Sequence, residues 1–133
     1  MNRKMLDTNI CIYLIKSRPQ SVREKFKQHE IGDLALSSIS VSELMYGAYK
    51  SLHVKQNLKA LELFLTPLDI VEYDYNAAVE YGKIRAILEK QGNVTGGLDM
   101  QIAAHARSLN MTLVSNNLKE FQRVEDLSLE NWI

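Results

Sequence analysis

The sequence predicts an α/β domain of three layers, in which helices cover both faces of a central, mostly parallel sheet. Short apolar runs typical of buried strands alternate along the chain with longer segments of helical periodicity. Such alternation indicates βαβ units, whose strands lie parallel. The length agrees, because 133 residues with 46% hydrophobic side chains suffice for one core and are too few for two ordinary domains. We therefore expect a single domain over residues 1–133.

The first strand is expected over residues 3–7, a short apolar run. It ends in Asp7-Thr8-Asn9, three residue types that favour helix starts, so a helix is expected over residues 8–16. A second helix is expected after Pro19.

In the middle of the chain, residues 34–39 form a run typical of a buried strand, and Ser40 to Glu43 has the S-x-x-E spacing that opens helices. Leucines then recur at the three-to-four spacing of one buried helical face. They are Leu58, Leu61, Leu65 and Leu68. Residues 70–73 are strand-like, and Asp74 is the expected cap of a helix that reaches residue 90.

The last third of the chain continues this alternation. Residues 91–97 contain three glycines and are expected to form a loop. A helix is expected over residues 98–109, followed by a buried strand at residues 111–114.

Composition excludes several classes of protein. Lys and Arg number 16 against 16 Asp and Glu, so the chain is no strongly basic nucleic-acid binder, and any attraction for phosphate must come from local arrangement. The apolar runs are far shorter than the ~20 residues that cross a bilayer, and we expect no signal segment and no membrane association. One cysteine, Cys11, cannot form an internal disulfide, which fits a cytoplasmic location.

Acidic residues follow or adjoin the predicted strands. Ligands of parallel sheets bind at the carboxyl ends of the strands, so we expect Asp7, Glu43 and Glu120 to approach one cleft, joined by Asp99 at the start of a helix. Four carboxylates in one place repel unless cations neutralise them. Oxygen ligands select Mg²⁺ or Mn²⁺, which suit phosphodiester cleavage. The remaining charges, 16 basic against 12 acidic, suit an RNA backbone.

Each of these acids also has a purely structural interpretation. Asp7 is a good helix cap, and Ser40 with Glu43 forms a capping box. Asp99 near a helix start complements the helix dipole, and Glu120 is of the type found on solvated surfaces. Spacing alone leaves both interpretations open.

Other conspicuous residues are expected to be structural. The three histidines, His29, His53 and His105, lack zinc-ligand spacing and are expected on the surface or in helix packing. Cys11 lies among apolar residues, which predicts a small buried side chain. Trp132 is expected to pack the C-terminal tail against the domain.

Four segments together resemble a known family. They are Met5-Leu6-Asp7-Thr8-Asn9, Ser38-Ile39-Ser40-Val41-Ser42-Glu43-Leu44-Met45-Tyr46-Gly47, Asp99-Met100-Gln101-Ile102-Ala103-Ala104-His105-Ala106 and Leu113-Val114-Ser115-Asn116-Asn117-Leu118-Lys119-Glu120-Phe121. In this order and in a chain of this length they resemble the PIN-domain ribonucleases, and more narrowly the VapC toxins of bacterial toxin–antitoxin pairs. The resemblance implies a PIN-like fold of the three-layer kind predicted above.

The resemblance also implies roles for particular residues. Asp7 matches the family's first metal-binding acid, Glu43 the acid of its S-x-x-E-L-x-x-G segment, and Asp99 the acid of its D-x-x-I-A helix. Many PIN domains place an Asp soon after a Thr-Asn pair, whereas here no acid follows Ser115 until Glu120. Glu120 is therefore assigned the fourth role.

Neutral residues beside these acids are assigned supporting roles. Asn117 is the alternative to Glu120 as a neutral ligand or as a group that positions water. Thr8, Asn9 and Ser115 are expected to support the acids or contact phosphate, with helix capping as the alternative.

The family's known properties define the expected function. The resemblance implies a Mg²⁺-dependent endoribonuclease, with Mn²⁺ as a substitute, that cleaves initiator tRNA in the anticodon stem-loop and halts translation. It also implies a homodimer and a VapB antitoxin, whose C-terminal segment blocks the cleft and whose N-terminal region binds operator DNA. Tyr46, Tyr49 and Leu52 are candidate contact surfaces for such partners.

Two other functions remain open at this point. One is a metal-independent ribonuclease, whose chemistry generally needs a histidine-type acid–base pair and leaves a cyclic phosphate. The other is a PIN-fold module that binds RNA without cleaving it. Metal-activated water should instead leave a 5′-phosphate, so analysis of the new ends separates the ribonucleases.

Overall fold

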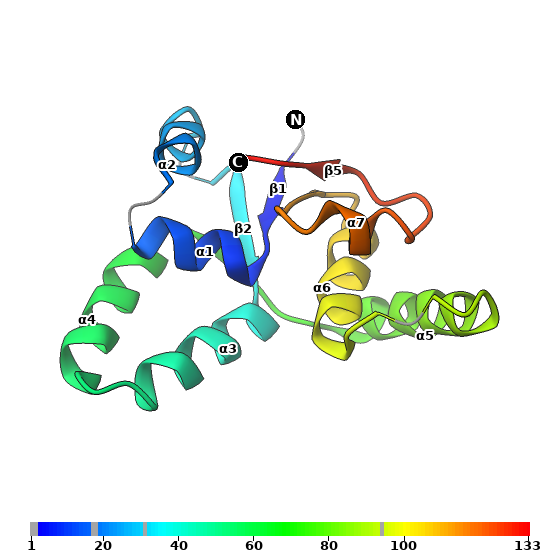
Figure 1. The fold of residues 1–133 in the computed structure, drawn as a ribbon, viewed down its shortest axis with the longest axis horizontal. Coiled ribbons are helices and arrows are strands. Elements are labelled where there is room, and N and C mark those ends of the chain that lie inside the picture. The colour runs from blue at the N-terminus through cyan, green and yellow to red at the C-terminus, as the bar shows by residue number, and fades with distance from the viewer. Residues whose placement is uncertain (1–2, 17–18, 31, 94) are drawn as a thin grey trace.

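A computed structural model describes residues 3–16, 19–30, 32–93 and 95–133. Within them a five-stranded parallel sheet, in the order β3-β2-β1-β4-β5, lies between two groups of helices (Figure 1). The strands are β1 (Lys4–Leu6), β2 (Leu34–Ser37), β3 (Asp69–Val71), β4 (Thr112–Val114) and β5 (Leu129–Glu130). The helices are α1 (Thr8–Ile15), α2 (Gln20–Lys27), α3 (Ser38–Tyr49), α4 (Val54–Leu65), α5 (Tyr75–Lys90), α6 (Gly97–Ser108) and α7 (Leu118–Phe121). The predicted three-layer α/β fold is confirmed.

Two apolar clusters pack on the opposite faces of the sheet. Successive strand residues point to opposite faces, so Met5 packs with α5 and α6 while Leu6 packs with α1, α3 and α4. In Figure 1 these two groups of helices lie on either side of β1 and β2, with α1, α3 and α4 at the left and α5, α6 and α7 at the right. Both faces of the central strands are therefore covered, which explains their continuous apolar sequences.

The strand register places three polar residues at one edge of the sheet. Leu6 of β1 pairs with Leu36 of β2 and with Val114 of β4. The residues that come next, Asp7, Ser37 and Ser115, therefore leave the sheet side by side at its carboxyl edge, and all three are buried. Parallel pairing thus brings together residues far apart in the sequence.

The start of α3 differs from the prediction. The strand ends at Ser37 rather than residue 39, and the Ser37 hydroxyl caps α3 by accepting a hydrogen bond of 3.1 Å from the Ile39 amide. Ser40 is fully buried within the helix, and Glu43 lies in its second turn. The capping box predicted for Ser40 and Glu43 is therefore wrong, because Ser37 caps the helix one turn earlier.

Other local predictions are confirmed. The Asp74 carboxylate caps α5, accepting a hydrogen bond of 3.0 Å from the Ala77 amide. Cys11 is buried. Trp132 is also buried, and its indole stacks on His29, with ring centroids 5.1 Å apart. The stacking of Trp132 on His29 holds the C-terminal tail against the segment that follows α2.

Two short elements were not predicted. Helix α7 spans four residues and β5 only two, which is too short for periodicity to reveal them. Strand β5 forms through its pairing with β4, a contact between distant parts of the chain. No helix in the described part of the chain is long and apolar enough to cross a membrane.

Candidate functional site

A cleft of about 690 Å³ opens at the carboxyl edge of the sheet, between α1, α3 and the start of α6. Its walls carry Asp7, Glu43 and Asp99, three of the four predicted acids. Thr8 and Asn9 line it as well. The convergence predicted from parallel-sheet topology is therefore found for these three carboxylates.

Asp7 is both a helix cap and part of the cleft. One carboxylate oxygen, Oδ1, accepts a hydrogen bond of 2.8 Å from the Ile10 amide at the start of α1, and the side chain is almost fully buried. Burial raises the pKa of Asp7 to about 6; hydrogen bonds from Ser115 and Ile10 oppose this, and the charges of Asp99 and Glu43 add to it. Capping engages one oxygen, so the two interpretations of Asp7 are compatible.

Thr8 holds the Glu43 side chain in place. The Thr8 hydroxyl donates a hydrogen bond of 2.7 Å to Glu43 Oε1 and lies 3.0 Å from the hydroxyl of buried Ser40. This contact ties the first turn of α1 to the second turn of α3 across the cleft. It fixes the direction of one carboxylate while leaving its second oxygen without a contact to Thr8.

Asp99 lies in the first turn of α6, where its negative charge interacts favourably with the helix dipole. Burial raises the pKa of Asp99, and the charges of Glu120 and Glu43 raise it further. The helix begins after Gly96, and a Cβ atom at that position would lie 3.8 Å from Asp99 Oδ2. A methyl group at position 96 would therefore be in ordinary van der Waals contact with the Asp99 carboxylate.

The fourth predicted acid lies near Asp99, whose pKa its charge raises more than the charge of Glu43 does. Glu120 belongs to α7 and is outside the lining of the cleft, although its charge acts on Asp99. Asn117, the alternative, precedes α7 without capping it through its side chain, and its backbone amide donates a hydrogen bond of 2.9 Å to the Ser115 hydroxyl. Ser115 is fully buried, and its side chain forms a hydrogen bond with the Asp7 carboxylate. The second group of predicted residues is thus connected to the cleft through the hydrogen bond of Ser115 to Asp7 and the charge of Glu120 on Asp99.

The described acids of the cleft do not form a closed set of metal ligands in this structure. Among the described residues, no three His, Cys, Asp or Glu side chains are close enough together to hold an ion between them. The donor set nevertheless fits a hard cation, since all the candidate ligands are oxygens and neighbouring carboxylates raise the pKa of both Asp7 and Asp99. Mg²⁺ keeps several of its waters and needs only one or two protein carboxylates.

The cleft also contains residues that the sequence did not assign to it. Tyr46 was expected only as a contact surface, and Lys50 was not singled out, yet both line the cleft. Their positions three and seven residues after Glu43 place them on the same helical face, which is the signal that would have identified them.

Comparison with known proteins agrees with this geometry. Residues 4–127 match the PIN domain family. The chain belongs to the PIN domain family.

Within this family the chain is similar over its full length to several VapC ribonucleases. It is 46% identical to the tRNA(fMet)-specific endonuclease VapC of Shigella flexneri over an alignment of 132 residues that covers 99% of each chain. It is 49% identical over 133 residues to ribonuclease VapC2 of Haemophilus influenzae, and all of both chains is covered. The crystal structure of DNA-bound VapBC from Salmonella typhimurium superposes with a TM-score of 0.94 at 42% identity, covering 100% of both chains.

Proposed function

We propose that this protein is the toxin of a VapBC-type toxin–antitoxin pair and acts as a divalent-metal-dependent endoribonuclease. The observation that carries this proposal is the convergence of Asp7, Glu43 and Asp99 in one cleft, where burial and mutual repulsion raise the pKa of both aspartates. Relatives named as VapC ribonucleases, 46–49% identical over nearly the whole chain, support it. A histidine-based mechanism has less support, since none of the cleft's described lining residues is a histidine.

Asp7, Asp99 and Glu43 would hold the metal, Mg²⁺ or in its place Mn²⁺. When bound, the ion would lower the pKa of a water molecule and offset charge on the leaving 3′ oxygen. The protein's contribution is to bring these carboxylates together in the cleft, where the raised pKa values of Asp7 and Asp99 indicate that negative charge lacks a partner and a cation would be favoured. Glu120 adds negative charge near Asp99, and we propose it as the fourth acid of the metal site, with Asn117 as the alternative.

The neutral residues orient the acids. The Thr8 hydroxyl donates a hydrogen bond to one oxygen of Glu43. The Ser115 hydroxyl forms a hydrogen bond with Asp7 and accepts another from the Asn117 backbone amide. We propose that Asn9, exposed on the cleft wall, contacts the RNA backbone. Such supporting groups typically change metal affinity or activity 10–100-fold when removed.

The proposed substrate is initiator tRNA, cleaved in its anticodon stem-loop with inhibition of translation. This rests on the names of relatives, among them the tRNA(fMet)-specific endonuclease of Shigella flexneri. Because translation is cytoplasmic, we propose that the protein acts in the cytoplasm.

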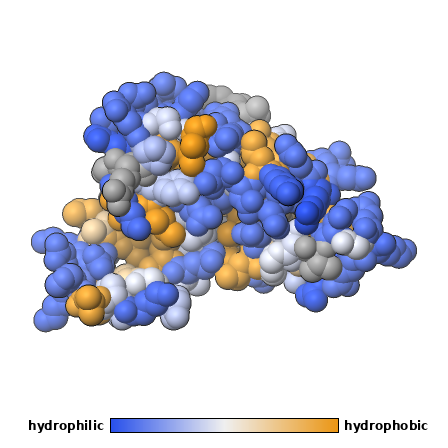
Figure 2. Space-filling view, in the orientation of Figure 1, coloured by the Kyte–Doolittle hydropathy of each residue, from blue (hydrophilic) through white to orange (hydrophobic). Residues whose placement is uncertain are grey.

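A second groove, of about 440 Å³, lies beside the acidic cleft between α1, α3 and α4. Ile12, Leu44 and Leu61 are among the apolar residues that line it, and Ile12 and Glu43 also line the cleft. Figure 2 shows hydrophobic side chains gathered in this region, between α1 and the α3–α4 hairpin. We propose that a VapB-type antitoxin covers this groove and blocks the adjoining cleft, reaching operator DNA through its own N-terminal region. We also propose that the toxin is a homodimer in this assembly.

Cleavage of initiator tRNA tests the proposed activity. The purified protein should cut an initiator tRNA transcript in Mg²⁺ but not in EDTA, and the new ends should carry a 5′-phosphate. Asp99→Asn should lower the rate by orders of magnitude, whereas Glu62→Gln, an exposed acid on α4, should leave it unchanged. Binding without cleavage in any metal would indicate an RNA-binding module, and cleavage that persists in EDTA would indicate a metal-independent ribonuclease.

A further inference from the structure

One wall of the acidic cleft is a strip of residues along α3. Glu43, Tyr46 and Gly47 belong to the helix, and Lys50 follows its last residue; all four line the cleft. Their spacing of three, four and seven residues places them on one helical face. At about 1.5 Å per residue, the strip extends roughly 10 Å outward from the carboxylates.

Tyr46 presents an aromatic ring to this cleft. Tyr46 is 66% exposed, so its ring is accessible to a molecule bound in the cleft. Gly47, which also lines the cleft, has open space where a Cβ would stand, with no atom within 4 Å. An exposed ring on the wall of an open cleft is an arrangement on which unpaired bases stack.

Lys50 supplies positive charge at the same place. Its ammonium Nζ lies 4.9 Å from the centroid of the Tyr46 ring, within the range of a cation–π contact. The other charged residues among the described lining of the cleft are acids, namely Asp7, Glu43 and Asp99. Lys50 therefore covers one face of the ring, leaves the rest exposed, and offers a cation to an anionic group bound beside it.

We infer that Tyr46 stacks on an unpaired base of the RNA next to the cleaved phosphate, and that Lys50 pairs with the adjoining phosphate. This inference rests on the proposed ribonuclease function and adds a specificity for nucleotides outside a duplex. A paired base has both faces covered by its neighbours and is unable to reach the ring, whereas a loop nucleotide can turn onto it.

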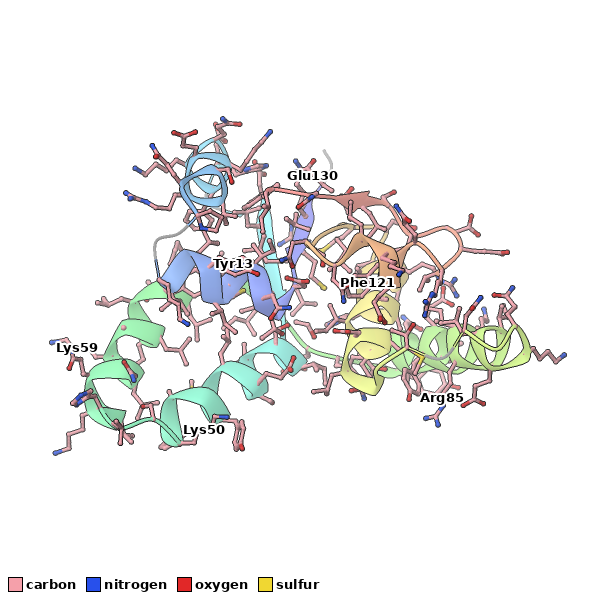
Figure 3. All side chains as sticks on the ribbon, in the orientation of Figure 1. Tyr13, Lys50, Lys59, Arg85, Phe121 and Glu130 are labelled. Carbon is pink, nitrogen blue, oxygen red and sulfur yellow. The ribbon has the colours of Figure 1, made fainter. Side chains whose placement is uncertain are left out.

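Tyr49 shows why exposure alone does not carry the inference. It lies on the same helix, and its exposed fraction, 64%, nearly equals that of Tyr46, but it is outside the lining of the cleft. It is therefore a matched control of the same residue type. For Lys50 the control is Lys59, which Figure 3 shows on α4, away from the end of α3 that bears Lys50.

The test measures binding and cleavage of an initiator tRNA transcript, with a fully paired RNA duplex as the comparison. Tyr46→Ala should weaken binding to the tRNA in EDTA and lower kcat/KM in Mg²⁺, each roughly 5- to 150-fold, the range for loss of one stacked base. Tyr46→Trp should restore both, because indole also stacks. Lys50→Met should reduce the slope of log affinity against log salt by about 0.7, as expected for one phosphate contact. Duplex binding should not respond to the Tyr46 variants.

Three outcomes separate the inference from the function on which it rests. If the wild type cleaves the tRNA and Tyr46→Ala behaves like Tyr49→Ala, the inference is overturned and the ribonuclease function stands. The same holds if Lys50→Met and Lys59→Met have equal salt dependence. If the wild type cleaves no RNA in Mg²⁺, the proposed function fails and this inference fails with it. Unchanged melting temperatures of the variants exclude misfolding as the cause of any loss.

Discussion

The buried charge of Asp7 makes a prediction about stability that is independent of RNA. The pKa of this carboxyl rises from an ordinary value of 3.8 to about 6 in the folded protein, chiefly through burial. Each pKa unit corresponds to about 1.36 kcal/mol, so ionised Asp7 costs the native state about 3 kcal/mol at pH 7.5 without metal. Asp7→Asn removes this charge and keeps an oxygen that can accept from the Ile10 amide. We therefore expect the variant to be more stable by about 1–3 kcal/mol in EDTA, even though it loses activity.

The pH dependence of this difference follows from the direction of the pKa change. The folded protein holds the proton more tightly than the unfolded chain, so the cost is full above pH 6 and disappears as the pH falls below 3.8. The advantage of Asp7→Asn should therefore shrink to about half by pH 5. Comparing the variant with the wild type at each pH cancels other titrations, including that of His105, whose pKa is lowered by burial.

Urea unfolding in EDTA at pH 7.5 and pH 5 measures this difference. Asp74→Asn is the matched control, because Asp74 caps α5 in the same way but is exposed, so its replacement should change stability little. Addition of Mg²⁺ should stabilise the wild type more than Asp7→Asn, since a ligand that binds only the native state raises its stability. A less stable Asp7→Asn at pH 7.5, or an advantage that does not change with pH, would refute the reasoning.

Three further substitutions test the supports of the site and of the fold. Thr8→Val removes the hydroxyl that orients Glu43, and should lower kcat roughly 10–100-fold with little change in the urea midpoint; unchanged cleavage would show that Glu43 needs no such support. Ser37→Ala removes the cap of α3 and the hydrogen-bond partner of buried His105 Nδ1, and should cost about 1–3 kcal/mol in urea unfolding; a loss below about 0.5 kcal/mol would contradict this. Trp132→Ala should cost about 3–5 kcal/mol, and an unchanged melting temperature would mean that the tail does not anchor to the domain.

Local chemistry made much of the architecture predictable. Asp74 was identifiable as a cap because Asp accepts from amides at helix starts, and its place between a strand-like run and a helical one marked the boundary. The central strands were identifiable because burial on both faces leaves continuous apolar runs. The same local reasoning failed at Ser40 and Glu43, where a spacing typical of a capping box lies inside a helix that Ser37 already caps.

The convergence of the acids was predictable in part. Alternating strands and helices imply a parallel sheet, and a parallel sheet brings the residues after its strands to one edge, so the approach of Asp7 and Glu43 was predictable. The position of Glu120, near Asp99 but outside the lining of the cleft, was not predictable, because it depends on where the short helix α7 packs. Its role in metal binding therefore stays a prediction.

The sequence alone determined the class of fold, the presence of acidic residues just after predicted strands, and the family resemblance. Each of these depends only on residue type and spacing along the chain. Only the tertiary structure decided that the Thr8 hydroxyl holds the Glu43 carboxylate, how far burial raises the pKa of Asp7, and that Tyr46 and Lys50 line the same cleft. The physical reason is distance: hydrogen bonds, desolvation and ring contacts depend on separations of a few ångströms between segments that lie far apart in the chain.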